Sequence, residues 1–263
     1  MKDIPVVILC GGFGTRMKEE TEFIPKPLVP IGGIPMIVHI MNIYYRHGYN
    51  KFVLPLGYKG DLIKDYFVNY RFSSDFKLKV RHGKDNQIEY IDTGKINEFD
   101  ITFIDTGIET QTGARIKKVR EYLKNNHDMF MLTYGDGVAD IDIDALMDFH
   151  LSHDKLATVT GVNEPFRYGM ITESEGKVLN FGEKKGSASN LINGGFFVFN
   201  TKFLDYIDDS LNTKLENEPL SNLASDGQLM VYMHDGRWAC ADMLREIDEL
   251  NELYYKGGAF WIS

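Results

Sequence analysis

The stretch PVVILCGGFGTRM, residues 5–17, decides how the rest of the chain is interpreted. Its first part is a short apolar run rich in β-branched residues, which is typical of a strand buried on both faces. Glycines follow at once, and glycine lets a backbone approach a ligand closely. Because ligands of parallel α/β sheets bind beyond the carboxyl ends of the strands, the stretch predicts a buried strand that ends in a ligand-binding loop.

The remaining chain alternates between helical and strand patterns. Apolar residues at helical spacing predict helices over 35–48, 59–70, 113–126, 141–154, 201–209 and 242–257. Short apolar runs predict strands at 51–57, 76–81, 87–91, 100–107, 128–134 and 156–162, with further strands and tight turns over 169–200. This order predicts an α/β fold with a Rossmann-like (doubly wound) mixed sheet, mostly parallel. We expect a single domain over residues 1–263, with an inserted β-rich lid or substrate region and a C-terminal helix.

The composition limits the class of protein. The 263 residues carry a net charge of −9 and no block of basic residues, which argues against nucleic acid and anionic membranes as partners. Cys10 and Cys240 form no CxxC pair, so neither a disulfide framework nor a thiolate zinc site is expected. No apolar run is long enough for a signal peptide or a membrane span. We therefore expect a soluble, cytoplasmic protein.

The glycine loop is suited to phosphate. Backbone N–H groups around Gly11, Gly12 and Gly14 can point at phosphate oxygens, and Arg16 adds a bidentate cation. The string matches neither GxxxxGK[ST] nor GxGxxG, because Met17 stands where the last glycine of the second motif would be. An ordinary glycine turn therefore stays open as the alternative.

Lys26 lies between two prolines in FIPKPLVP, residues 23–30. Proline fixes its own φ and restricts the residue before it, so we expect this lysine on a stiff, extended segment. Such a mount suits a lysine that must meet a polyphosphate at a set distance. The alternative is a solvated lysine in a proline-rich turn.

Several acidic and polar residues stand at turns. Asp136, in a Gly-Asp-Gly turn after a buried strand, can coordinate Mg²⁺ or bond its own backbone. Asp242 precedes the last helix, where an N-cap is the ordinary role, and the aspartates at 140, 142 and 144 are interpreted as helix-cap and first-turn charges. Glu183 and Lys184 could grip a sugar hydroxyl and a phosphate, or form a solvated charged turn. Asn193, beside two glycines, could bind a hydroxyl or mark a bulged strand.

Taken in order, these motifs resemble the sugar-phosphate nucleotidyltransferases. The order is GGFGTRM, PKPLVPIGG, YGDG, EKK, INGGFFV and a late aspartate before a helix, and the likeness runs from about residue 5 to Trp261. The segments GYKGDLIKDYF, TQTGARIKKV, YGDGVADIDI and EPL are similar to the branch that joins CTP to glucose 1-phosphate.

The resemblance implies a role for each motif. The backbone from Leu9 to Gly14, with Thr15 and Arg16, would cradle the CTP phosphates, and Lys26 would contact the α-phosphate region and the sugar phosphate. Three further sets are implied: Thr110, Arg115 and Gly135 in the nucleotide pocket, Asp136 and Asp242 on Mg²⁺, and Glu183, Lys184 and Asn193 on the sugar 1-phosphate. Members of the family are commonly homo-oligomers.

Some positions depart from the family pattern. Lys185 replaces the usual proline, Ile24 stands where the branch often has another lysine, and Gln111 and Ala114 alter the TGGR segment. The residues before the late aspartate read WACA rather than WQPM. Because the phosphate-binding positions are kept, these changes bear on the acceptor more than on CTP.

The reaction expected from this set is an in-line displacement at the α-phosphorus of CTP, with Arg16 and Lys26 as the catalytic cations. Two alternatives stay open. One is a nucleotidyltransferase of the same fold that uses CTP or UTP with a different phosphorylated acceptor. The other is a non-catalytic nucleotide-binding relative.

Overall fold

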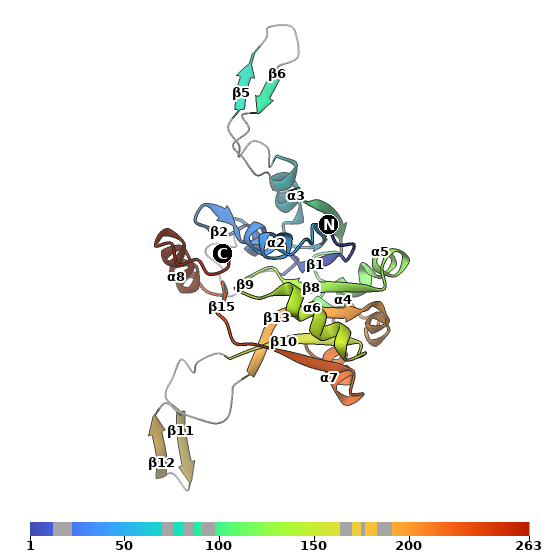
Figure 1. Cartoon of the computed structure of the whole chain (residues 1–263), viewed down its shortest axis with the longest axis vertical. Coiled ribbons are helices and arrows are strands. Elements are labelled where there is room, and N and C mark those ends of the chain that lie inside the picture. The colour runs from blue at the N-terminus through green and yellow to red at the C-terminus, as the bar shows by residue number, and fades with distance from the viewer. Residues whose placement is uncertain are drawn as a thin grey trace.

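A seven-stranded sheet forms the centre of the molecule (Figure 1). The computed structural model describes residues 1–12, 23–69, 76–80, 87–90, 98–163, 170–174, 177–182 and 191–262. The strand order is β14-β10-β13-β8-β1-β4-β7, and every neighbouring pair is parallel except the two that include β13. The predicted mixed, mostly parallel sheet is therefore confirmed. Its strands are β1 (Val6–Leu9), β4 (Lys51–Leu56), β7 (Asp100–Asp105), β8 (Met129–Tyr134), β10 (Ala157–Asn163), β13 (Leu191–Asn200) and β14 (Leu229–His234).

Helices cover both faces of this sheet. Strand β1 shows why, because Val6 and Ile8 belong to one apolar cluster while Val7 and Leu9 belong to another. A strand with a core on each side needs apolar residues at every position. The first cluster includes residues of α2 (Met36–Arg46), α3 (Gly60–Val68), α6 (Ile143–Ser152) and α8 (Leu244–Tyr255). The second includes residues of α4 (Thr112–Lys118), α5 (Arg120–Asn126) and α7 (Glu218–Ser225).

Short two-stranded sheets and 3-10 helices complete the fold. Figure 1 shows the hairpins β5–β6 and β11–β12 extending from the body in opposite directions, the second of them in the region expected to be an inserted lid. The short strands are β2 (Pro30–Ile31), β3 (Ile34–Pro35), β5 (Phe76–Lys79), β6 (Gln87–Tyr90), β9 (Gly137–Ala139), β11 (Met170–Ser174), β12 (Lys177–Gly182) and β15 (Trp238–Cys240). The 3-10 helices are η2 (Lys26–Leu28) and η4 (Thr201–Tyr206).

Two helix predictions need correction. The single helix expected over 113–126 is two helices, α4 and α5, that meet at Val119. The N–H of Val119 bonds the carbonyl of Ile116, three residues back, and this tighter turn ends α4. The helix expected over 201–209 is the 3-10 helix η4, whose first turn is capped by the side chain of Asn200.

The extended segment predicted at Lys26 is also wrong. Pro25 is extended, but Lys26 opens the 3-10 helix η2, which is closed by the N–H of Leu28 on the carbonyl of Pro25 at 2.8 Å. Pro27 fits here because the first helical positions need no backbone donor. The lysine is therefore mounted on a short rigid turn.

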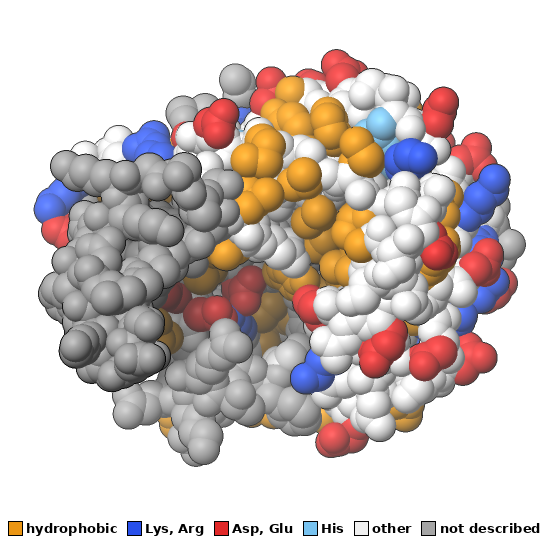
Figure 2. Space-filling view, turned by 90° about the horizontal axis from the view of Figure 1, so that it is seen from below, with side chains coloured by type: hydrophobic (Ala, Val, Ile, Leu, Met, Phe, Trp, Pro, Cys, Tyr) orange, Lys and Arg blue, Asp and Glu red, His pale blue; other side chains and the backbone are white. Residues whose placement is uncertain are grey.

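One face of the molecule combines an apolar patch with a polar hollow (Figure 2). The hollow exposes acidic side chains, and apolar side chains gather beside it. Val231 and Met233 of the edge strand β14 are among the exposed apolar residues. Among the helices that the structure describes, none has the length and apolar content needed to cross a membrane.

Candidate active site

The carboxyl ends of β1, β4 and β7 are held together by Arg115, which lies on α4. Its side chain is buried, and Nη1 and Nη2 of the guanidinium lie within hydrogen-bond distance of five acceptors. Four of these are backbone carbonyls at or just beyond the carboxyl ends of the three strands, so the cation fixes these segments against one another. The acceptors are the carbonyls of Gly11 (2.8 Å), Leu56 (3.0 Å), Gly107 (2.9 Å) and Ile108 (3.1 Å) and the hydroxyl of Thr106 (2.6 Å).

Thr110 closes the loop that follows β7. Its hydroxyl donates to the carbonyl of Thr106 at 2.6 Å, and the side chain is buried. The ammonium of Lys118 donates to the same carbonyl at 2.7 Å and to the Thr110 hydroxyl at 3.3 Å. Thr110 and Arg115, both expected in the nucleotide pocket, thus lie together and shape one loop.

The turn that carries Asp136 lies against the end of β1. A Cβ added to Gly135 would stand 2.8 Å from the carbonyl oxygen of Leu9, closer than real Cβ atoms come, so only glycine permits this approach. Leu9 and Gly135 were both expected at the nucleotide. Gly11 and Gly12 follow β1 after Cys10, whereas Gly14, Thr15 and Arg16 lie outside the described residues.

Asp242 reaches Asp136 through a small antiparallel pairing. Strand β15 pairs with β9, with Cys240 opposite Gly137, and the N–H of Ala241 donates to the carbonyl of Asp136 at 2.8 Å. The buried Glu246 then accepts from the N–H groups of Asp242 (2.7 Å) and Met243 (3.1 Å). The N-cap of α8 is Met243, so the interpretation of Asp242 as the N-cap is wrong by one residue.

Lys26 joins the two aspartates. Its Nζ lies 2.5 Å from Oδ2 of Asp136 and 2.5 Å from Oδ1 of Asp242. The lysine side chain is 16% exposed and the carboxylates 28% and 33%, so the solvated-lysine alternative is wrong. Burial works against the charged form, but the two carboxylates outweigh it and raise the pKa of Lys26. One cation between two anions leaves the cluster with a net negative charge.

This donor set fits a magnesium ion. Mg²⁺ prefers hard oxygen ligands and usually takes one or two carboxylates from the protein, with water and substrate phosphates in the remaining positions. Asp136 and Asp242 supply two carboxylates at one point, and a cation, the Lys26 ammonium, already lies between them. The observation that supports the fit is therefore the convergence of both carboxylates on a single positive charge.

A hydrogen-bonded chain of side chains includes Tyr134, which precedes Asp136 by two residues. Asn193, on β13, donates through Nδ2 to the hydroxyl of Tyr134 at 3.3 Å, and that hydroxyl donates to Glu216 at 2.6 Å. The other carboxylate oxygen of Glu216 accepts from Thr112 at 2.9 Å. Asn193 was expected from the sequence, while Tyr134 and Glu216 were not. Glu183, Lys184 and Lys185 lie outside the described residues.

The bulge predicted near Asn193 is also present. The pairing of β10 with β13 shifts register between Val159 and Gly161, and Gly161 stands opposite Asn193. The bulge and a binding role do not exclude one another, because bulges commonly re-aim a side chain. The amide of Asn193 is exposed at the edge where β8 ends.

A second group of possible metal ligands lies at the amino end of α6. His47, Asp142 and Asp144 place one ligand atom each within 4.8 Å of one another. Asp142 accepts from the N–H of Ala145 as the N-cap, and Asp144 pairs with Lys2, as expected for helix-terminal charges. Asp140 was expected to do the same, but it instead accepts from the N–H of Arg237 at 2.7 Å.

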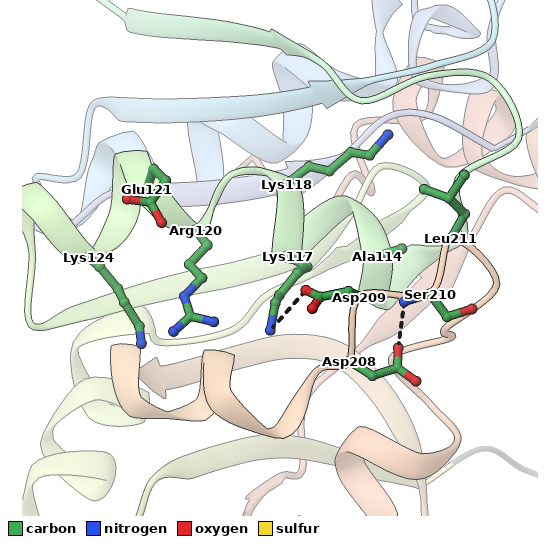
Figure 3. Close-up of a pocket in the computed structure, with 10 residues that line it drawn as sticks. All are labelled: Ala114, Lys117, Lys118, Arg120, Glu121, Lys124, Asp208, Asp209, Ser210 and Leu211. Atoms are coloured by element: carbon green, nitrogen blue, oxygen red, sulfur yellow. Dashed lines mark hydrogen bonds and ion pairs between the residues drawn. The ribbon is translucent and has the colours of Figure 1, made fainter.

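The pocket drawn in Figure 3, of about 510 Å³, lies between α4–α5 and the loop after η4. Its basic side chains are paired within the protein: Lys117 with Asp209, and Arg120 and Lys124 with Asp205. Lys118 points away from them (Figure 3), toward the loop of Thr110. Glu121 and Asp208 also line the pocket, so its four basic side chains face four carboxylates when Asp205 is counted, and the pocket has no excess of positive charge for an anion.

The fold and this site define a class of protein, and the chain belongs to the nucleotidyl transferase family, whose sequence profile matches residues 5–240. Within that class, it is 44% identical over 256 residues to the glucose-1-phosphate cytidylyltransferases of Salmonella typhi and Salmonella typhimurium, with 97% of each chain covered. The crystal structure of HddC from Yersinia pseudotuberculosis superposes with a TM-score of 0.66 at 23% identity, covering 95% of this chain and 99% of that one. That likeness supports the Rossmann-like fold.

Proposed function

We propose that the protein is a glucose-1-phosphate cytidylyltransferase, which joins CTP to glucose 1-phosphate and releases pyrophosphate and CDP-glucose. The observation that carries the proposal is the convergence of Lys26, Asp136 and Asp242 at the carboxyl edge of the sheet. The 44% identity to curated enzymes of that name over 97% of both chains supports the choice of substrates.

The reaction is an in-line displacement. An oxygen of the sugar phosphate attacks the α-phosphorus of CTP, the bond from that phosphorus to the bridging oxygen breaks, and pyrophosphate leaves with the electron pair. The attacking oxygen is already anionic, so no general base is needed. The barrier is repulsion between two anions and charge growing on the leaving group, so positioning and fixed cations supply most of the catalysis.

Each group of residues is proposed to have a separate role in this reaction. Lys26 would neutralise charge at the α-phosphate and the incoming sugar phosphate, and Arg16 would steady the leaving pyrophosphate. The backbone after Leu9, with Thr15, would hold the triphosphate, while Arg115 and Thr110 keep the neighbouring loops in register. The acceptor would be held by Glu183, Lys184 and Asn193.

Asp136 and Asp242 would hold Mg²⁺, which when bound offsets the negative charge of the phosphates. Lys26 now compensates these two carboxylates. With a metal ion on the carboxylates, the ammonium would be released from them to meet phosphate oxygens instead.

A panel of nucleotides and acceptors, assayed for pyrophosphate release, tests the proposal. We expect CTP with glucose 1-phosphate to give the highest kcat/KM and a product with the mass of CDP-glucose. A higher value with UTP, or with another phosphorylated acceptor, would favour the first alternative. Calorimetric binding of CTP without pyrophosphate release from any pair would favour the non-catalytic relative.

Assembly into a homo-oligomer is also part of the proposal. The apolar patch of Figure 2 and the exposed Val231 and Met233 on edge strand β14 support it, because monomers rarely expose large apolar patches. Light scattering coupled to gel filtration measures the mass directly, and the 30.1 kDa mass of a single chain would contradict this part.

A further inference from the structure

The hydrogen-bonded chain from Glu216 to Asn193 has a fixed polarity. An ionised carboxylate can only accept, so the proton of the Tyr134 hydroxyl must go to Glu216, 2.6 Å away. Thr112 obeys the same rule, because its oxygen accepts from the N–H of Leu215 at 2.9 Å and its proton goes to Glu216.

That polarity decides how the amide of Asn193 is oriented. With its proton on Glu216, the Tyr134 oxygen can only accept from Asn193, which requires Nδ2 on that side. The carbonyl side, Oδ1, accepts from the N–H of Gly195 at 2.9 Å. A flipped amide would place its NH₂ against the Gly195 N–H and its oxygen against a tyrosine oxygen that has no proton to give. Only one orientation satisfies both neighbours.

An amide held in this way is suited to recognise a hydroxyl. It has a second N–H and a second lone pair beyond those used inside the protein, and Asn193 is exposed at the edge where β8 ends. Tyr134 is followed two residues later by Asp136, so the same strand end supports the phosphate chemistry and the amide. Lys26 attracts the phosphate end of an acceptor, and the Glu216 carboxylate repels it, which orients the hydroxyl end toward Asn193.

We propose that Tyr134 and Glu216 are positioning residues for the acceptor: they hold the Asn193 amide in the one orientation that binds a hydroxyl of the sugar. This rests on the proposed function for the identity of the acceptor. The two residues act through Asn193, and neither needs to touch the substrate. The pairing of these two residues could not be predicted from the sequence, because Glu216 lies 82 residues from its partner Tyr134.

Kinetics with deoxy analogues test the proposal. We compare glucose 1-phosphate with its 2-, 3-, 4- and 6-deoxy forms, with CTP as the nucleotide, in the wild type, Tyr134→Phe, Glu216→Ala and the double variant. Loss of one oriented hydrogen bond predicts a rise of roughly 5–10-fold in KM for glucose 1-phosphate in Tyr134→Phe, with kcat and KM for CTP changed less than about twofold.

Two further results are expected. For one deoxy analogue, the wild type should have a lower kcat/KM than for glucose 1-phosphate. This difference should be smaller in both Tyr134→Phe and Glu216→Ala. The double variant should be no worse than Tyr134→Phe, because both changes break one chain of bonds. Tyr206→Phe is the matched control, since its hydroxyl donates to Asp226 at 2.8 Å in the same kind of pair, on η4; its constants should equal those of the wild type.

The outcomes separate the two proposals. A wild type that does not turn over glucose 1-phosphate refutes the proposed function and this inference with it. An active wild type whose Tyr134→Phe variant keeps its KM and its discrimination, or loses affinity for CTP equally, refutes the inference alone. If thermal unfolding shows that Tyr134→Phe is not folded, Glu216→Ala decides, because Glu216 is exposed and its truncation leaves no cavity.

Discussion

Lys26 and Asp136, 110 residues apart in the chain, meet with Nζ 2.5 Å from Oδ2 at the carboxyl edge of the sheet. The contact places a partly buried cation where the reacting phosphates are proposed to lie. Replacing Lys26 by Ala removes a preorganised charge contact, so we expect turnover to fall by roughly 10²–10³. Lys64→Ala, on the exposed face of α3, is the control and should retain full activity. Normal turnover in a folded Lys26→Ala variant would contradict the role.

The two aspartates give a prediction on magnesium. Asn at position 136 or 242 keeps the shape of the side chain but removes one negative charge from the pair. We expect the Mg²⁺ concentration for half-maximal activity to rise about 10-fold or more, because even changes beyond the metal ligands cost 10–100-fold. Asp61→Asn, whose side chain is 94% exposed, serves as the control. An unchanged magnesium requirement in Asp136→Asn and Asp242→Asn would show that neither carboxylate holds the metal.

The local pattern of the sequence was enough to predict most strands of the main sheet. The apolar run at Val6–Leu9 predicted a strand with a core on each face, and the Gly-Asp-Gly turn placed Asp136 at the end of another. These features are encoded within a few residues, by periodicity and by turn chemistry. The edge strand β14, of six residues, and the helix α7, of eight residues with a proline in its first turn, were missed.

The assembly of the site could not be predicted in the same way. Asp242 reaches Asp136 through the three-residue pairing of β15 with β9, and no local pattern encodes the partner of so short a strand. The contact of Tyr134 with Glu216 likewise depends on where a distant loop packs. The family resemblance named Asp242, whereas physics alone left it as a helix cap.

A prediction on Arg115 separates its structural support of the site from direct binding of CTP. Lys in its place keeps the charge but cannot reach carbonyls at the ends of three strands, so buried acceptors lose their partners. We expect the free energy of unfolding to fall by roughly 2–4 kcal/mol and KM for CTP to rise about tenfold as the loops separate. Urea unfolding and steady-state kinetics measure the two effects. Arg245, on α8, has a side chain that is 85% exposed, so Arg245→Lys should change neither the stability nor the KM. A stable Arg115→Lys variant with normal KM would refute the supporting role.

Acid sensitivity is expected from a histidine pair at the C-terminal end of α6. The Thr158 hydroxyl lies 2.9 Å from Nδ1 of His150 and 2.8 Å from Nε2 of His153. Burial, and next the charge of His153, lowers the pKa of His150 to about 4. Between pH 6.5 and 4 the unfolded chain therefore binds a proton that the folded chain does not, and stability falls as the pH falls. The loss attributable to His150 is roughly 2–3 kcal/mol.

Urea unfolding at pH 7 and pH 4.5 measures this loss. His150→Gln, which cannot titrate, should lose less stability over this range than the wild type. His127→Gln, outside the pair, should match the wild type. Equal losses in all three proteins would show that His150 is not the source.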